Sequence, residues 1–410
     1  MSSSYRKPGI SGLAIGFACG MVATATAQAA QTCFQPQVDL RVESNSNIDL
    51  NPDGSPDGSV EGYIADLQAL LGYYTQRAET SVRPRLRLQN YPDRDQREKT
   101  EGFLDWVTRY QWERSQFYMI ASYAREDSFN YDTRSGEFDP LDPTSPTGSG
   151  SGKFLNDETQ TKIEVRPRFT FDITERLSAR FGGQVRTMDY DAAVGEPENV
   201  DYDFWLANTE LRWALDERSN IGVGGYFSEY DVKSDSGDSD SYGIALGYDR
   251  NWSEVMGMEV TLGYEVNDPT NPAPGEGDQK SSSIGGSIEA FGEGEVSKWR
   301  VLAGQRYAPN GNGRMRQISQ FRFQYDRNLT QRLIFRSAAR YESQQALQTG
   351  SDNGNKDTAR LDLSLRWMLS RKWFVQGGYS YVWRQEANDD AGDNNRFFLG
   401  GGYRGLDRER

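Results

Sequence analysis

Histidine is absent from the sequence, and only two of its 410 residues are cysteines, Cys19 and Cys33. The lack of histidine excludes a Ser-His-Asp triad, a histidine-assisted phospholipase site and a histidine-ligated zinc site. Cys19 lies in an N-terminal segment that we expect to be removed, so the mature chain has one thiol, which can form neither an internal disulfide nor a thiolate metal cluster. The sequence therefore predicts a protein that is not an enzyme and that has no metal or other cofactor.

Long apolar runs are also missing. Beyond the N-terminal segment no run of about 18 apolar residues occurs, so no transmembrane helix is predicted. The formal net charge is −14, yet 12% of the residues are aromatic, which is a high share for so polar a chain and argues against disorder. If this protein crosses a membrane, it has to do so with strands.

The N-terminus has the features of a secretory signal. Arg6 and Lys7 precede an apolar, small-residue stretch that ends in the Ala-x-Ala steps 25–27 and 27–29. The alternative, a retained membrane anchor, would need a longer apolar core. We expect residues 1–29 to be a signal peptide removed after Sec-type export, residues 30–405 to form the folded unit, and residues 406–410 to be a short C-terminal tail.

Apolar and polar residues alternate with a period of two along most of the chain. In the stretch 63–73 every odd position is apolar or small, while Asp66 and Gln68 occupy the other face. A soluble β-sandwich also alternates in this way, so the length of the segments has to decide. We count about eighteen segments of roughly 9 to 15 residues, which is typical of tilted membrane-spanning strands and longer than the strands of most soluble sheets.

The connections between these segments alternate strictly between two kinds. One kind is short, such as "ERS" and "SRK", and the other is longer and rich in Asp, Gly, Ser, Asn and Pro. This pattern is typical of bacterial outer-membrane barrels. The predicted fold is all-β: a transmembrane antiparallel β-barrel of about 18 strands, with 16 as the alternative, with short periplasmic turns and long acidic extracellular loops. The protein is therefore expected to be integral to the bacterial outer membrane.

Arginines are concentrated on the polar face of the predicted strands, as in "SVRPRLRLQNY" at 81–91 and "VRPRFTF" at 165–171. A lipid-facing arginine costs about 2–4 kcal/mol at the bilayer midplane, so these side chains should face the lumen. Pro84 and Pro167 are expected to cause a local bulge or fray. The predicted pore-lining basic belt, nearest the periplasmic end, comprises Arg83, Arg85, Arg109, Arg166, Arg168, Arg180, Arg212, Arg300, Arg336 and Arg366. Acidic residues of the same parity, expected as lumen partners, are Asp66, Asp105, Glu164, Glu210 and Asp362.

Two interpretations of this belt remain open. A ring of guanidinium groups in a narrow aqueous lumen would concentrate anions and bind carboxylate or phosphate groups. Alternatively, arginines and acidic residues form a ladder that links neighbouring strands and fills the lumen. A similar choice concerns the long connection 126–157. It is either a solvated external loop or a constriction folded into the lumen, with the acidic residues Asp132, Glu137, Asp139 and Asp142.

The N-terminal part of the mature chain resembles a bacterial family. The stretch "QVDLRVESNSNIDL", the Tyr-Pro-Asp after an arginine-rich strand and the turn "ERSQF" are similar to beta-barrel porin 2, a family whose members are often linked to exopolysaccharide or capsule operons. The architectural resemblance covers about Gln31 to Tyr403. It implies an outer-membrane channel, with polysaccharide export among its functions, and it carries no established catalytic residues.

The sequence thus predicts a porin-like channel that passes hydrophilic, anionic solutes or an exopolysaccharide through an arginine-lined lumen. The alternative is a non-conducting structural or assembly-associated barrel closed by its own Arg and acid pairs. Expected partners are outer-membrane lipid and lipopolysaccharide, the outer-membrane assembly machinery and a polysaccharide. Nucleic acid is not an expected partner, because the basic face belongs to a pore wall.

Overall fold

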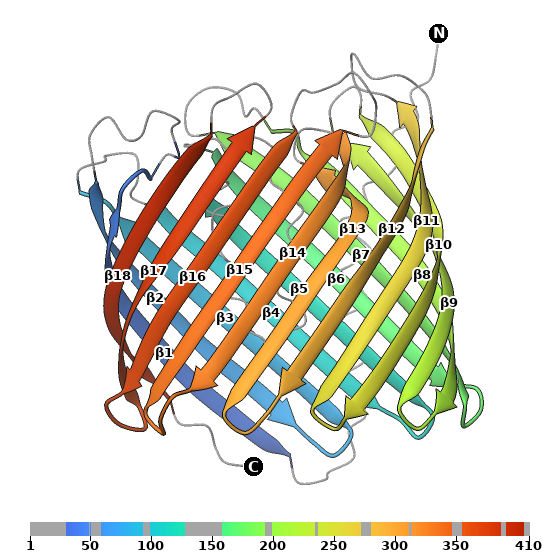
Figure 1. Ribbon diagram of the computed structural model, residues 1–410, viewed down its shortest axis with the longest axis horizontal. Coiled ribbons are helices and arrows are strands. Elements are labelled where there is room, and N and C mark those ends of the chain that lie inside the picture. The colour runs from blue at the N-terminus through green and yellow to red at the C-terminus, as the bar shows by residue number, and fades with distance from the viewer. Residues whose placement is uncertain are drawn as a thin grey trace.

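The computed structural model describes residues 30–48, 50, 59–92, 99–127, 158–192, 199–233, 237–271, 280–310, 314–346, 355–386 and 391–405. They form a closed barrel of eighteen antiparallel strands, in which each strand pairs with its neighbours in sequence and β1 closes the barrel with β18 (Figure 1). The expected barrel with 18 strands is confirmed, and the alternative of 16 strands is wrong. No helix in the described part of the chain is long and apolar enough to cross a membrane.

The strands are long, between 13 residues in β3 and 16 residues in β7. Their bounds are β1 (Gln31–Asn45), β2 (Val60–Tyr74), β3 (Ala78–Asn90), β4 (Lys99–Gln111), β5 (Ser115–Asp127), β6 (Glu158–Asp172), β7 (Leu177–Ala192), β8 (Tyr202–Asp216), β9 (Ser219–Val232), β10 (Asp238–Ser253), β11 (Met256–Asn271), β12 (Ser281–Glu293), β13 (Ser297–Asn310), β14 (Arg314–Asn328), β15 (Leu333–Ala346), β16 (Lys356–Met368), β17 (Trp373–Glu386) and β18 (Gly392–Arg404).

The two ends of the barrel differ in their connections. At one end, which we call the turn end, neighbouring strands are joined by short turns such as 75–77 and 217–218. The N-terminal end of β1 and the C-terminal end of β18 lie at this turn end, where Gln37 pairs with Arg404. The opposite end, which we call the loop end, carries the remaining connections, many of whose residues lie outside the described ranges.

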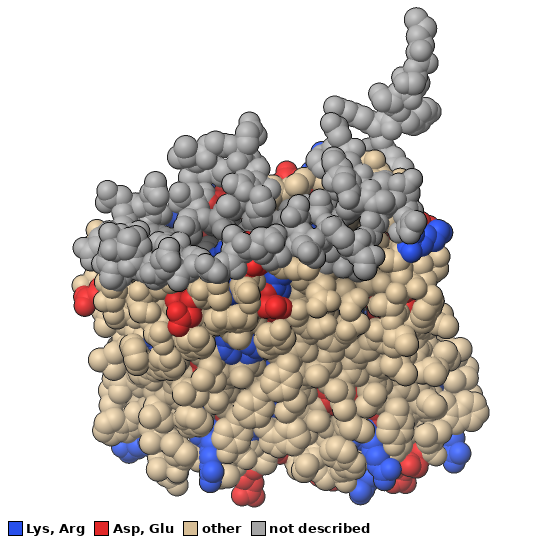
Figure 2. Space-filling model, turned by 45° about the horizontal axis from the view of Figure 1, so that its top comes forward, with Lys and Arg blue, Asp and Glu red and all other residues tan. Residues whose placement is uncertain are grey.

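The outer surface of the barrel is an apolar belt. Side chains alternate between the two faces of each strand, and the outward positions hold exposed apolar residues such as Ile244 and Ile284, each 68% exposed. Trp213, Trp367 and Trp373 are exposed near the turn end, where an aromatic girdle is expected. In Figure 2 the wall is largely free of charge, and charged side chains gather along its lower edge. So much exposed apolar surface needs an apolar solvent.

Replacing Leu262, which is 59% exposed on the outer face of β11, tests this orientation. Leu262→Arg should lower the free energy of unfolding by about 2–4 kcal/mol in lipid vesicles, because the guanidinium would lie in the hydrocarbon region. Ser287→Arg is the matched control. Ser287 lies at the same depth, opposite Thr261, but on the inner face, so the loss should stay within about 0.5 kcal/mol. Equal losses in the two variants would contradict the orientation.

Both prolines of the arginine-rich strands interrupt strand pairing on one side only. Between β2 and β3 the pairing stops at Gln68 with Arg85 and resumes at Leu71 with Val82. Pairing of β3 with β4 continues through Pro84. The same interruption occurs at Pro167, on the side of β6 that faces β7. The register is unchanged across each gap, so the expected fray is present and the expected bulge is not.

Candidate functional site

The lumen is lined by the face opposite to the apolar belt. All ten arginines of the predicted basic belt occupy inner-face positions, in alternation with outward residues such as Leu86, Phe169 and Trp367. They lie between the middle of the barrel and the turn end. Here the period-two pattern fixes the direction of the side chain, while the register fixes its depth.

Several of these arginines are paired with carboxylates. Asp66, which is 6% exposed, accepts hydrogen bonds from Arg85 Nε at 3.0 Å and from Arg87 Nε at 2.8 Å. The guanidinium of Arg41 lies 3.7 Å from the same carboxylate. One buried acidic group thus holds three arginines from β1 and β3 together. Arg87 belongs to the arginine-rich stretch 81–91 that was expected to face the lumen, but it was not included in the predicted belt. Arg41 was not predicted, although it has the inner-face parity.

A second buried carboxylate, Glu164, plays a similar part on β6. It lies 2.8 Å from Arg166 Nε and accepts a hydrogen bond from Arg186 Nε at 3.1 Å. Arg186, on β7, was also missed. The remaining pairs of the predicted residues are Arg180 with Glu210, Arg212 with Glu210 and Asp249, Arg300 with Glu289, Arg336 with Asp326, and Asp362 with Arg360. The pairs of Arg180 with Glu210, Arg212 with Asp249, Arg300 with Glu289 and Arg336 with Asp326 link different strands, whereas Arg212 with Glu210 and Arg360 with Asp362 lie within one strand.

Arg366 and Arg83 have different surroundings. Arg366 donates hydrogen bonds to the Gln376 side chain at 2.7 and 3.0 Å and lies 4.4 Å from the centroid of the Phe374 ring. Arg83 lies opposite Asp105 in the register of β3 and β4. Two further arginines, Arg109 and Arg168, are exposed to the lumen. They lie on either side of Tyr118 in the sheet.

Arg109, Tyr118 and Arg168 form what we call the basic patch. They lie side by side on β4, β5 and β6, because Tyr118 pairs with Arg109 on one side and with Arg168 on the other. The Arg109 guanidinium lies 5.7 Å from the centroid of the Tyr118 ring, in a cation–π contact. Within the described ranges neither arginine has a carboxylate at ion-pair distance, and both are exposed. Among the described residues, the basic patch therefore presents two guanidinium groups to the lumen without a direct ion-pair partner.

Acidic groups line a different part of the wall. Asp249, Glu259 and Glu289 occupy successive positions across β10, β11 and β12, and we call them the acidic row. Arg168 interacts electrostatically with Glu259, although β6 and β11 are not neighbours in the barrel. The basic patch and the acidic row therefore occupy different parts of the lumen wall. Within the row, Asp249 pairs with Arg212 and Glu289 pairs with Arg300.

Towards the loop end the wall itself narrows the lumen. β12 and β13 pair from Glu293–Lys298 up to Gly286–Gln305 and then separate, and the upper end of β13 bends away from β12 (Figure 1). The backbone N–H of Tyr307 donates a hydrogen bond of 3.0 Å to Glu265 Oε2 on β11. The end of β13 therefore passes behind β12, on the lumen side.

An apolar cluster fills the space between this bent segment and the opposite wall. Met315 and Tyr307 pack against inner-face residues of β7, β8 and β9, among which Met188 and Tyr202 are completely buried. We call this set the inner apolar cluster: Met188, Tyr190, Tyr202, Phe204, Tyr230, Val232, Tyr307 and Met315. Apolar residues at inner-face positions are unusual in a polar lumen, and they are the sequence signal that could have revealed this contact.

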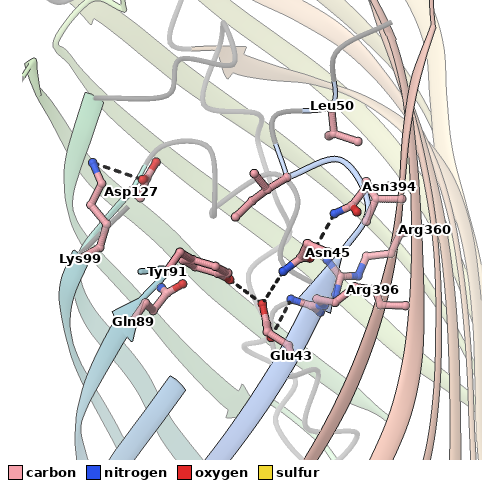
Figure 3. A pocket seen from close by; sticks show the side chains of 13 residues that line it. Glu43, Asn45, Leu50, Gln89, Tyr91, Lys99, Asp127, Arg360, Asn394 and Arg396 are labelled. Carbon is pink, nitrogen blue, oxygen red and sulfur yellow. Dashed lines mark hydrogen bonds and ion pairs between the residues drawn. The ribbon is translucent and has the colours of Figure 1, made fainter. Parts of the chain in front are cut away.

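A small polar cavity near the loop end is closed by its own hydrogen bonds. Figure 3 shows Tyr91, Asn45 and Arg396 directed at the carboxylate of Glu43. Lys99 lies 3.5 Å from Asp127 on the other side. The cavity has about 40 Å³ of free space, enough for a few water molecules and too small for a solute.

The predicted constriction residues Asp132, Glu137, Asp139 and Asp142 lie outside the described residues. That prediction stays untested. Among the described residues, no group of three or more Cys, Asp or Glu side chains is arranged to hold a metal ion.

Comparison with known proteins identifies related architecture only. No protein-family model and no curated protein matches the chain. OccAB3 of Acinetobacter baumannii is 12% identical, with a TM-score of 0.44 over 92% of this chain and 98% of that chain. The outer membrane protein OprD of Pseudomonas aeruginosa is 10% identical, with a TM-score of 0.42 over 91% and 93%. Such values carry no argument about function, and the resemblance to beta-barrel porin 2 stays a prediction.

Proposed function

We propose that this barrel is integral to the outer membrane and is a channel for small hydrophilic solutes, with a preference for anions. The observation that carries the proposal is the basic patch, in which Arg109 and Arg168 are exposed to the lumen without a carboxylate at ion-pair distance within the described ranges. The apolar belt supports the membrane location, since it is stable only against lipid.

Inner-face side chains are more exposed towards the turn end, where solutes can reach the basic patch. Inner-face residues towards the loop end, such as Arg87, Gln160 and Gln344, are at most 3% exposed, whereas Arg109 and Arg168 are exposed. A positive charge in a low-dielectric wall raises the local concentration of anions, and a guanidinium can bind a carboxylate or phosphate in a bidentate way. The turn-end half of the lumen is therefore a vestibule that attracts anions.

The alternative function, a non-conducting barrel, is supported by a separate observation. Most arginines of the belt are paired, and the inner apolar cluster fills part of the loop-end half. If this packing closes the lumen completely, the barrel is structural. Passage of an exopolysaccharide remains the expectation drawn from the family resemblance.

Swelling of proteoliposomes in isotonic sugar solutions tests the proposal. We expect gluconate to enter several-fold faster than the similarly sized cation glucosamine, with neutral glucose between them, because the basic patch selects by charge. Liposomes without protein are the control. Faster entry of glucosamine would contradict the anion preference, and failure of all three to enter would support the non-conducting barrel.

A further inference from the structure

The separation of β12 and β13 is not caused by unequal strand lengths. The last pair towards the loop end is Gly286 with Gln305. If the same register continued, Gly285 would pair with Arg306, and the two strands would end together at Ser281 and Asn310. Both strands are therefore long enough for a complete ladder, but their parts nearest the loop end do not pair.

The inner flap, as we call it here, consists of residues 306–310 of β13, which lie beyond the last pair with β12, and of residues 314–318 of β14, which pair with them. Residues 316–318 also pair with β15. Tyr307 and Met315 have the parity of the outward, lipid-facing side chains of their strands, such as Val301 and Phe321. In the inward position they pack instead on the other members of the inner apolar cluster, which lie on β7, β8 and β9. Paired with β12, the same apolar face would meet lipid. The flap therefore has an apolar environment in either position.

Polar contacts hold the flap in its inward position. Glu265 accepts a hydrogen bond from Tyr307 N at 3.0 Å and another from the hydroxyl of Tyr226 on β9. The side-chain amide of Gln305 donates to the carbonyl oxygen of Ile284 at 3.3 Å, which satisfies one backbone group at the open edge of β12. These contacts take the place of the ladder that β12 and β13 do not form.

The sequence of β12 leaves room for this arrangement. A Cβ atom on Gly285 would lie 2.8 Å from the Glu265 carboxylate and 3.1 Å from the backbone oxygen of Gln305. The neighbouring inner-face positions beyond the last pair with β13 are Ser281 and Ser283, both small. Larger side chains there would prevent β13 from passing behind β12.

We propose that the inner flap exchanges between the inward position and a position in the wall, in which the ladder between β12 and β13 is complete and the lumen is wider. The inward position is stabilised by the inner apolar cluster and the Glu265 contacts. The position in the wall would be stabilised by the ladder pairs between β12 and β13 that are now missing. Two packings of one segment, each internally satisfied, are what a gate requires. The effect on conductance rests on the proposed channel function, but the movement itself does not.

A disulfide between positions 284 and 307 reports on the wall position. Ile284 is 68% exposed on the outer face, whereas Tyr307 packs on the inner apolar cluster, so the two side chains point to opposite sides of β12. In a completed ladder they would be opposed, at the Cα separation of about 4.5–5.5 Å that a disulfide accepts. In a Cys33→Ser background, the variant Ile284→Cys/Tyr307→Cys should form the disulfide under mild oxidation, and reduction should reverse it.

The control pair is Ser319→Cys/Ser343→Cys, whose positions are already paired in β14 and β15. Failure of the 284–307 disulfide under conditions that oxidise the control pair would overturn the exchange. When the disulfide forms, the channel should conduct several-fold more than after reduction. An unchanged conductance in a conducting barrel would overturn the gate. A disulfide in a barrel that never conducts would support the movement and count against the proposed function.

A second variant leaves Tyr307 in place. Glu265→Ala removes the acceptor for Tyr307 N and Tyr226, so it should raise the open fraction of the wild-type flap several-fold. Glu229→Ala is the matched control, because Glu229 lies on β9 at an outward position, where it accepts a hydrogen bond from Trp205 Nε1. Equal conductance of Glu265→Ala and Glu229→Ala would contradict the role of Glu265 in holding the flap.

Discussion

The variant Arg109→Glu/Arg168→Glu should reverse the ion preference of the channel. In a tenfold gradient of potassium chloride a perfectly selective pore has a reversal potential of about 59 mV, with a sign set by the permeant ion. The reversal potential of the wild type should have the sign expected for a chloride-permeable pore, and that of the variant the sign expected for a potassium-permeable pore. The shift between them should be tens of millivolts. The reason is that the two exposed guanidiniums of the basic patch, which have no direct ion-pair partner within the described ranges, become carboxylates.

The control for this reversal is Arg176→Glu, in the exposed turn between β6 and β7. It makes a charge-reversing substitution outside the lumen, where water and salt screen it. Its reversal potential should stay close to that of the wild type. If the double variant behaved like Arg176→Glu, the basic patch would not line the path of the ions.

Asp66→Asn is expected to be among the most destabilising single substitutions in the barrel. Its carboxylate is buried between Arg41, Arg85 and Arg87, and Arg87 is 3% exposed. Removal of one partner of a buried ion pair leaves an uncompensated charge and costs about 3–5 kcal/mol. The free energy of unfolding, measured by urea titration in lipid vesicles with tryptophan fluorescence, should fall by that amount.

Asp191→Asn provides the comparison for Asp66→Asn. Asp191 also pairs with an arginine, at 3.5 Å from Arg125 Nη2, but both side chains are more than half exposed. Such surface pairs contribute about 0–1 kcal/mol, so the loss should be small. If Asp66→Asn cost less than about 1 kcal/mol, the arginines around Asp66 would have other compensation, and the ladder would not stabilise the wall as described.

The sequence predicted the wall because the wall repeats one physical rule. Apolar residues such as Ile244 and Leu262 alternate with polar ones along every strand, and lipid outside and water inside require that alternation at each position. The same parity placed Arg85 and Arg168 in the lumen. The number of strands followed from the number of alternating segments, because every such segment is one strand of the wall. Each strand has two neighbours in the closed barrel.

Pairing inside the lumen could not be predicted in the same way. Whether Arg85 meets Asp66, or Arg168 remains exposed beside Tyr118, depends on register between strands that the alternation alone does not determine. The inward bend of β13 was missed for a different reason. Tyr202 and Tyr230 have inner-face parity, but an apolar residue in a lumen becomes meaningful only when the segment that covers it is known.

Current through wild-type protein in a planar lipid bilayer with a salt gradient tests the central claim most directly. The claim is that the lumen is a water-filled path in which Arg109 and Arg168, exposed towards the turn end, favour anions. We expect discrete, steady conductance steps whose reversal potential has the sign of chloride. A barrel that is correctly folded and inserted, yet silent at every voltage, or one that prefers potassium, would contradict it.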